Sequence, residues 1–168
     1  MSRDTTMWTT CFRKDHDGVR ISTRTDYGVR ALIELARANR LLSAEQIATA
    51  QHISQPFLLT LLAELRRAGL VTSQRGKNGG WSLARPAQAI TIADVIRAVD
   101  GPLINVHGSR PEDIDYGSAG HGLQLVWIAL RSSLREVLEH VTITDVADGT
   151  LPPSIHSRTQ DDEVWHSR

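Results

Sequence analysis

The residues with the clearest chemistry are cationic side chains around a glycine-rich turn, Arg75-Gly76-Lys77-Asn78-Gly79-Gly80. The glycines have no side chain, so the backbone of this turn can approach a partner closely. Residues 64–85 hold five basic residues against one acidic residue, Glu64, which gives this segment a charge of +4 in a chain that is neutral overall. Clustered guanidinium and ammonium groups neutralise phosphates. The pattern therefore predicts a surface that binds a phosphate backbone.

Charge is distributed unevenly along the 168 residues. Residues 1–85 carry 13 basic and 7 acidic side chains, whereas residues 86–168 carry 6 and 12. The sequence pI of about 7.1 does not exclude a nucleic-acid partner, because binding depends on the local field of one face. We therefore expect double-stranded DNA to bind the first half. A hydrophobic content of 40% suffices for one modest core.

Three helices are predicted ahead of the glycine-rich turn. Apolar residues recur at helical spacing over residues 25–38. Ser43 and Gln46 have the spacing of a capping box, which begins a second, short helix. Ser54 is expected to cap a third helix, and Gly69 suits its left-handed end. Strand patterns on both sides of the turn then predict a hairpin, so the order is a helix-turn-helix followed by a wing.

This arrangement predicts which side chains contact DNA. The exposed N-terminal end of the third helix would meet base edges in the major groove, and an arginine on a thin wing suits the negative potential of a narrow minor groove. The N-terminus of the first helix could bind a phosphate through free N–H groups. The predicted DNA contacts are Arg24, Thr25, Tyr27, Ser54, Gln55, Pro56, Thr60, Arg66, Arg75 and Lys77.

Each of these contacts has a simpler alternative. The wing tip could be an ordinary solvated hairpin, and Arg66 and Arg67 could be routine surface charges. Trp81 could stack on a base, but a wing tryptophan more often packs the hairpin onto the helices, which is the interpretation we favour.

The second half is predicted to contain a capped helix, a loop and a long helix. Thr91 and Asp94 cap the first helix, and residues 103–120 lack periodicity, so they are the candidate sensing loop. From Leu123, apolar residues recur at intervals of 4, 3, 4, 3 and 4, which is the spacing of a coiled-coil seam. The predicted dimerisation seam consists of Leu123, Trp127, Leu130, Leu134, Val137 and Val141.

The two ends of the chain and its metal donors are less informative. Residues 1–20 and 151–168 are expected to be a disordered leader and tail. Cys11 is the only cysteine, which excludes a site built from several thiolates of one chain. His107 and His121 flank the loop as candidate metal ligands, although lone histidines are more often plain polar residues. No pattern of nucleophile, base and orienting group suggests an enzyme.

Targeting signals are also missing from the sequence. Met1 to Arg20 contains no apolar run, and no later stretch approaches the roughly 20 apolar residues that span a bilayer. We therefore expect a cytoplasmic protein with no membrane partner.

A series of motifs from the third helix through the hairpin has a specific order. These motifs are Leu65-Arg66-Arg67-Ala68-Gly69-Leu70-Val71, Arg75-Gly76, Gly79-Gly80 and Leu83-Ala84-Arg85-Pro86. In this order they resemble the Rrf-type (IscR- and NsrR-like) family of bacterial transcriptional regulators, over roughly residues 19–150. The resemblance implies a mainly α fold with a small β-hairpin wing. It also implies homodimers that bind pseudo-palindromic operators, with the third helix in the major groove and the wing arginine in the minor groove.

The chain accordingly divides into a winged helix-turn-helix domain over residues 21–86 and a second region over residues 87–150. The second region holds the linker helix, the sensing loop and the long dimerisation helix. Many family members hold an iron-sulfur cluster through three cysteines in this loop, but residues 103–122 contain none. A cluster of that kind cannot form, so we expect no cofactor, and the signal would be an unknown small molecule or protein.

Family members usually begin only a few residues before the first helix. Val19 lies at that place, so our hypothesis is that Val19 is the true initiator and residues 1–18 are an extended gene prediction. A protein mass that includes Met1 or Ser2 would refute it. As a whole, the sequence predicts a homodimeric DNA-binding regulator, most simply a repressor. The alternative is a winged-helix module that binds a protein instead of DNA.

Overall fold

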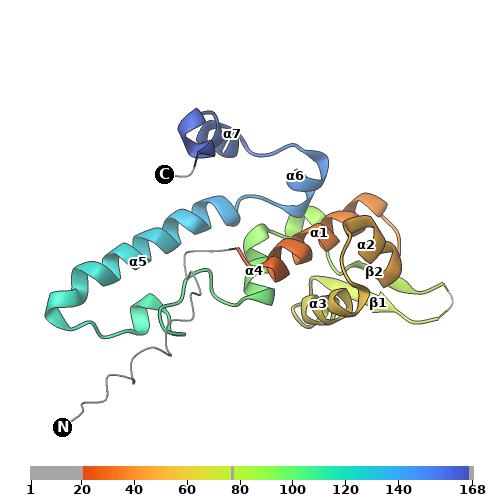
Figure 1. Ribbon diagram of the computed structural model, residues 1–168, viewed down its shortest axis with the longest axis horizontal. Helices are drawn as coiled ribbons and strands as arrows, with labels where there is room; N and C mark the ends of the chain where they lie inside the picture. Colours follow the sequence, from red (N-terminus) through yellow and green to blue (C-terminus); the bar gives the residue numbers. More distant parts are fainter. Residues whose placement is uncertain (1–20, 77, 167–168) are drawn as a thin grey trace, which may run out of the picture.

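The computed structural model describes residues 21–76 and 78–166, and this part of the chain is mainly helical with one antiparallel hairpin. Figure 1 shows the hairpin projecting from one end, whereas the longest helix, α5, reaches away towards the other. The predicted fold class is confirmed. The elements are α1 (Thr23–Ala38), α2 (Ala44–Gln51), α3 (Gln55–Arg67), β1 (Val71–Gln74), β2 (Gly80–Leu83), η1 (Ala87–Ala89), α4 (Ile92–Val99), η2 (Pro111–Asp113), α5 (Gly117–Leu138), α6 (Ile143–Asp148), α7 (Pro153–Thr159) and η3 (Asp162–Trp165).

The helices begin at the capping residues that the sequence indicated. Ser43 Oγ accepts a hydrogen bond from the Gln46 backbone N–H at 3.1 Å, and Gln46 Oε1 accepts one from the Ser43 N–H at 2.9 Å. Ser54 Oγ accepts the Phe57 N–H at 3.4 Å and so begins α3. Each such cap stabilises a helix by about 1 kcal/mol. Local sequence therefore determines where the helices of the N-terminal half start.

The core lies between α1, α2, α3, α4 and α6. Leu32, Leu62 and Ile90 are fully buried in it, and so is Ile143 of α6. The Ile143 N–H donates to the Ile90 carbonyl at 2.9 Å, which ties α6 back onto the segment before α4. The core therefore continues across residue 86, where the sequence analysis divided the two regions.

The hairpin is held against the helices by a third short extended segment. β1 and β2 pair with Val71 opposite Leu83 and Gln74 opposite Gly80. Leu42 and Trp81 exchange backbone hydrogen bonds of 3.0 and 2.7 Å, so the wing is joined to the chain before α2. A Cβ atom on Gly80 would lie 2.7 Å from the Leu42 carbonyl oxygen, so only glycine fits this crossing.

Helix α5 has 22 residues, and among those whose side chains are described none is buried. It packs against its own chain mainly through η2 and α4. One residue of the predicted seam lies elsewhere. Val141 is only 7% exposed, lies after the end of α5 and accepts the Ile92 N–H at 3.0 Å, so it belongs to the core. Leu125 and Val126 lie outside the predicted seam but are 53% and 56% exposed.

The C-terminal segment corrects the prediction of a disordered tail, because residues 153–165 form α7 and η3. Pro153 takes the first position of α7, where a missing N–H costs nothing. Arg158 pairs with Glu136 of α5 at 3.0 Å, and Trp165 Nε1 donates to the Thr159 carbonyl at 3.0 Å. The predicted leader, residues 1–20, lies outside the described residues. No helix in the described ranges is long and apolar enough to span a bilayer.

Candidate nucleic-acid interface

One face of α3 is turned to solvent because the other carries the leucines of the core. Leu58, Leu61, Leu62 and Leu65 are buried. The opposite side is exposed in the first and last turns of the helix, with Ala63 and Glu64 half-buried between them, and it presents Gln55, Pro56, Leu59, Thr60, Arg66 and Arg67. All of the α3 residues that the sequence predicted as contacts lie on this face. Ser54, the N-cap, is exposed at its first turn.

Arg66 joins the end of α3 to the wing. Its Nη1 donates to Ser73 Oγ at 3.2 Å, and its guanidinium carbon lies 5.9 Å from the centre of the Trp81 ring. Trp81 is half-buried against the core, which supports the prediction that it packs the hairpin onto the helices. The contacts hold the Arg66 charge at the junction between α3 and the hairpin.

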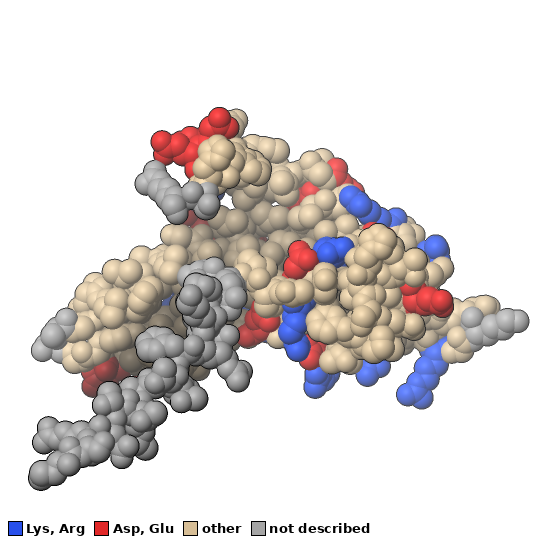
Figure 2. Space-filling model, in the orientation of Figure 1, with Lys and Arg blue, Asp and Glu red and all other residues tan. Residues whose placement is uncertain are grey.

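The wing tip carries an exposed cation of the predicted set. Arg75 is exposed directly after β1, and no hydrogen bond or ion pair joins it to any residue within 21–76 and 78–166. Gly76 follows with a φ of 110°, a conformation that glycine adopts without strain. Lys77 lies outside the described residues. Figure 2 shows Lys and Arg side chains along the edge formed by α3 and the hairpin.

The N-terminus of α1 does not support the predicted phosphate site. Thr25 is only 2% exposed, and its Oγ1 donates to Asp100 Oδ2 at 2.8 Å. Ser22 caps the helix and also donates to the same carboxylate at 2.5 Å. Asp100 thus already places negative charge beside this helix end, where it would repel a phosphate. The prediction that Thr25 contacts DNA is corrected to a structural role.

Arg24 and Tyr27 lie where α1 meets α3. Arg24 Nη2 donates to Glu64 of α3, and this hydrogen bond, with the charge of Glu64, raises the pKa of the Arg24 guanidinium. Tyr27 packs edge-on against Phe57 at 5.9 Å, with an interplanar angle of 82°. Both residues lie beside α3, but the Arg24 charge is already partly neutralised. Their predicted contacts with DNA remain predictions.

Leu59 is a candidate contact that the sequence analysis missed. It is 42% exposed in the middle of the solvent face of α3, between the polar first turn and the arginines. A large apolar side chain on a cationic surface is suited to the methyl group of thymine in the major groove. The signal was present in the sequence, because Leu59 does not belong to the buried stripe.

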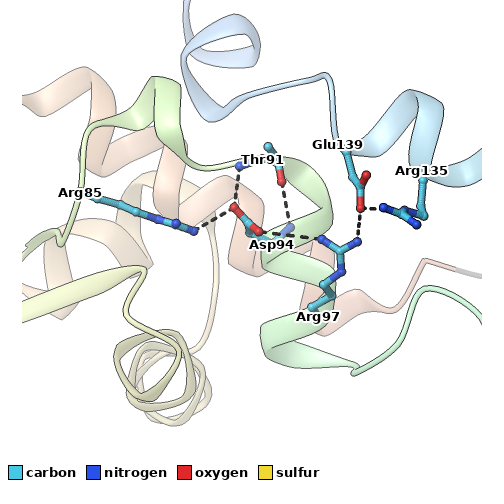
Figure 3. A network of polar contacts seen from close by, with 6 residues as sticks. All are labelled: Arg85, Thr91, Asp94, Arg97, Arg135 and Glu139. Atoms are coloured by element: carbon cyan, nitrogen blue, oxygen red, sulfur yellow. Dashed lines mark hydrogen bonds and ion pairs between the residues drawn. The ribbon is translucent and has the colours of Figure 1, made fainter.

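A chain of polar contacts connects the base of the wing to α5 (Figure 3). Arg85, which follows β2, donates to Asp94 Oδ2 at 2.8 Å, and Arg97 lies 4.0 Å from the other oxygen of Asp94. Arg97 also pairs with Glu139, which accepts a hydrogen bond from Arg135 of α5 at 3.0 Å. A change at α5 therefore has a physical connection to the wing.

The predicted metal ligands do not come together. Among residues 21–76 and 78–166, no group of three His, Cys, Asp or Glu side chains is placed to hold a metal ion. His107 has a left-handed backbone, and His121 is exposed in the first turns of α5. The loop before α5 contains no cysteine, so its donor atoms do not fit a thiolate-ligated iron-sulfur cluster.

Comparison with known proteins gives one consistent result. The model of the Rrf2 family, described as an iron-dependent transcriptional regulator, matches residues 21–149. Rv1287 of Mycobacterium tuberculosis (strain H37Rv), a protein assigned to the HTH-type transcriptional regulators, is 42% identical over 145 residues, which cover 85% of this chain and 90% of the relative. CymR of Bacillus subtilis, also an HTH-type transcriptional regulator, is 35% identical over 134 residues, covering 79% and 92%.

Two solved structures share the fold. The structure of CymR, the global cysteine regulator of B. subtilis, matches with a TM-score of 0.66 at 35% identity, covering 79% of this chain and 98% of that one. The structure of T. potens IscR matches with a TM-score of 0.63 at 31% identity, covering 89% and 98%. The helices and the wing are therefore arranged as in these regulators.

Proposed function

The chain belongs to the Rrf2 family of DNA-binding transcriptional regulators, and we propose that it acts as a homodimeric repressor on a palindromic operator. The observation that carries this proposal is the shared surface of α3 and the wing. Gln55, Thr60 and Arg66 lie on the solvent face of α3, and Arg75 stands exposed on the adjoining hairpin. This surface suits a duplex, because a helix fits the major groove and a thin wing reaches the minor groove beside it.

The contacts fall into two groups. Gln55 and Thr60, with Leu59, lie near the start of α3 and would meet base edges, so they would determine which operator is bound. Arg66 and Arg75 would contact the phosphate backbone or the minor groove and supply affinity that does not depend strongly on sequence. Because Arg66 already lies over the Trp81 ring, its side chain loses less conformational entropy when it binds DNA.

Helix α5 supports a dimer. Leu123, Leu125 and Val126 are exposed on a helix that has no fully buried side chain among those described. Apolar surface of this kind is stabilised by burial against another copy, and a two-fold axis is the commonest way to bury it. Two α3 helices related by that axis would read half-sites about one helical turn apart, which makes the operator a palindrome.

Repression is the simplest mode, because a dimer bound over a promoter excludes polymerase without further contacts. The family and the relatives are regulators of transcription, and we propose no enzymatic activity. Since the bound partner is the bacterial chromosome, we place the protein in the cytoplasm.

The rival function is a winged helix that binds a protein through the same surface. Protein interfaces are depleted of charge at their centre, whereas this surface sets Leu59 among polar and cationic side chains. Titration of labelled promoter fragments with purified protein separates the two functions. We expect sequence-specific binding that weakens steeply with salt, together with a dimeric mass by light scattering. A strictly monomeric protein, or one that binds no native promoter fragment at low salt, would overturn the proposal.

A further inference from the structure

A second cationic site lies away from the proposed DNA surface. A cleft of about 510 Å³ is formed by the end of α4, the loop that follows it and one side of α5. Its volume falls within the range of roughly 300–1,000 Å³ that is usual for small-molecule sites. Four arginines line this cleft together with a single carboxylate, that of Glu112. The arginines are Arg97 from α4, Arg110 from the loop, and Arg131 and Arg135 from α5.

The cleft has more positive charge than its own carboxylates neutralise. Arg131 pairs with Glu112 at 2.5 Å, and Arg135 shares Glu139 with Arg97. Arg110 is exposed, and its guanidinium forms no hydrogen bond or ion pair with the described part of the chain. Four guanidiniums therefore face these two carboxylates and that of Asp94, which lies 4.0 Å from Arg97 and is shared with Arg85 outside the cleft.

Both carboxylates remain ionised at neutral pH. A backbone hydrogen bond and the Arg131 guanidinium lower the pKa of Glu112, and hydrogen bonds from Arg97 and Arg135 lower the pKa of Glu139. The excess of positive charge in the cleft is thus present under physiological conditions, where it would attract an anion.

We propose that this cleft binds a small anion that carries two or more carboxylate or phosphate groups on a short carbon skeleton. Arginine forks donate paired hydrogen bonds to two oxygens of either kind of group, and Glu112 already shows that a carboxylate fits beside Arg131. Leu103 and Ile104, both half-buried, supply an apolar wall for the skeleton. Arg110 is free to close on the ligand.

This ligand would be the signal of the regulator, an inference that rests on the proposed function. An anion bound to Arg97 and Arg135 competes with Glu139 for the same guanidiniums. Arg97 is also connected through Asp94 to Arg85 at the base of the wing, as Figure 3 shows. Binding would therefore shift the contact between α4 and α5. Through Asp94, it would also change the ion pair with Arg85 at the base of the wing.

Calorimetry on the full-length protein tests the site without any DNA. Citrate represents the carboxylate class, fructose 1,6-bisphosphate represents the phosphate class, and glycerol is the neutral probe, all at matched ionic strength. We expect citrate or fructose 1,6-bisphosphate to bind saturably and glycerol not to bind. Arg110→Gln and Arg131→Gln should each weaken binding about tenfold, because each removes a charge-assisted contact. Arg158→Gln, which removes an ion pair to α5 outside the cleft, is the matched control and should bind as the wild type does.

The outcomes distinguish the site from its regulatory role. If neither anion binds saturably, or if the cleft variants bind as tightly as the control, the site is refuted. If binding is lost in the cleft variants, the site is supported, and the preferred probe gives the ligand class. Operator titrations with and without that probe then test the coupling, and an unchanged DNA affinity would refute it. A protein that binds the anion but no DNA would refute the proposed function while the site stands.

Discussion

Replacing Arg75 by alanine gives the sharpest test of the wing. Arg75 is exposed and has no partner within the described residues, so its loss should leave the fold unchanged. A dimer carries two copies of this arginine. Each lost contact costs about 1 kcal/mol or more, so the dimer should lose about 2 kcal/mol, which is roughly a thirtyfold weaker affinity.

The salt dependence gives a second, independent number. The logarithm of the association constant falls with the logarithm of salt concentration by about 0.9 for each phosphate neutralised, so the slope for Arg75→Ala should be shallower by about 1.8. Fluorescence anisotropy of labelled operator between about 50 and 200 mM salt measures both quantities.

Two further variants make the Arg75 experiment specific. Arg158→Ala removes the same side chain from α7, far along the chain from the wing, and should leave affinity and slope unchanged. Arg75→Lys keeps the charge but loses the planar fork, so it should retain the salt slope and recover only part of the affinity. If Arg75→Ala bound the operator with wild-type affinity and slope, the wing tip would have no part in DNA recognition.

Four other changes have defined outcomes. Leu59→Ala should relax the preference at one thymine in each half-site by a few-fold, measured by selection from randomised operators; an unchanged preference would remove Leu59 from base reading. Val126→Asp should weaken the dimer at least tenfold by sedimentation while the helix content by circular dichroism is kept, and a stable dimer would contradict the role of α5. Thr25→Val removes the hydrogen bond to Asp100, so the free energy of unfolding in urea should fall by about 1 to 3 kcal/mol. Its operator affinity should stay within about twofold of the wild type, and a specific loss of DNA binding would restore Thr25 as a contact. The folded state holds the pKa of Glu139 below its ordinary value of 4.5, so the ionised carboxylate stabilises the folded protein above that pH. This stabilisation is lost as pH falls through the lower pKa of the folded state. The urea midpoint of Glu139→Gln should therefore fall less on acidification than that of the wild type.

The helix starts and the wing could be predicted from sequence because local chemistry determines them. Ser43 with Gln46, and Thr91 with Asp94, satisfy backbone groups only three residues away, so no distant residue is needed to interpret them. The exposed face of α3 follows in the same way from the spacing of its leucines. These features are local in the chain, which is why the structure agrees with them.

The sequence was less informative where distant segments meet. Thr25 looked like an available hydroxyl at a helix start, but Asp100 lies 75 residues further along the chain and binds it. Val141 continued the apolar spacing of α5, yet α5 ends at Leu138 and Val141 pairs with Ile92 in the core. Periodicity shows that a residue is apolar, but it does not show which surface will cover it.

Helix α5 shows why dimerisation and the wing should be considered together. An isolated helix gains most of its stability from burying an apolar face, and none of the described side chains of α5 is fully buried within its own chain. Burial in the proposed dimer would stabilise α5 further, and Arg135 of the same helix donates to Glu139, which pairs with Arg97 of α4. A shift at the dimer interface would change the contact with Arg97, and Asp94 connects Arg97 to the base of the wing. Spatial connection alone does not establish coupling. The decisive measurement is a double-mutant cycle between Glu139→Gln and Arg85→Gln read as operator affinity, in which purely additive effects would show that α5 and the wing respond independently.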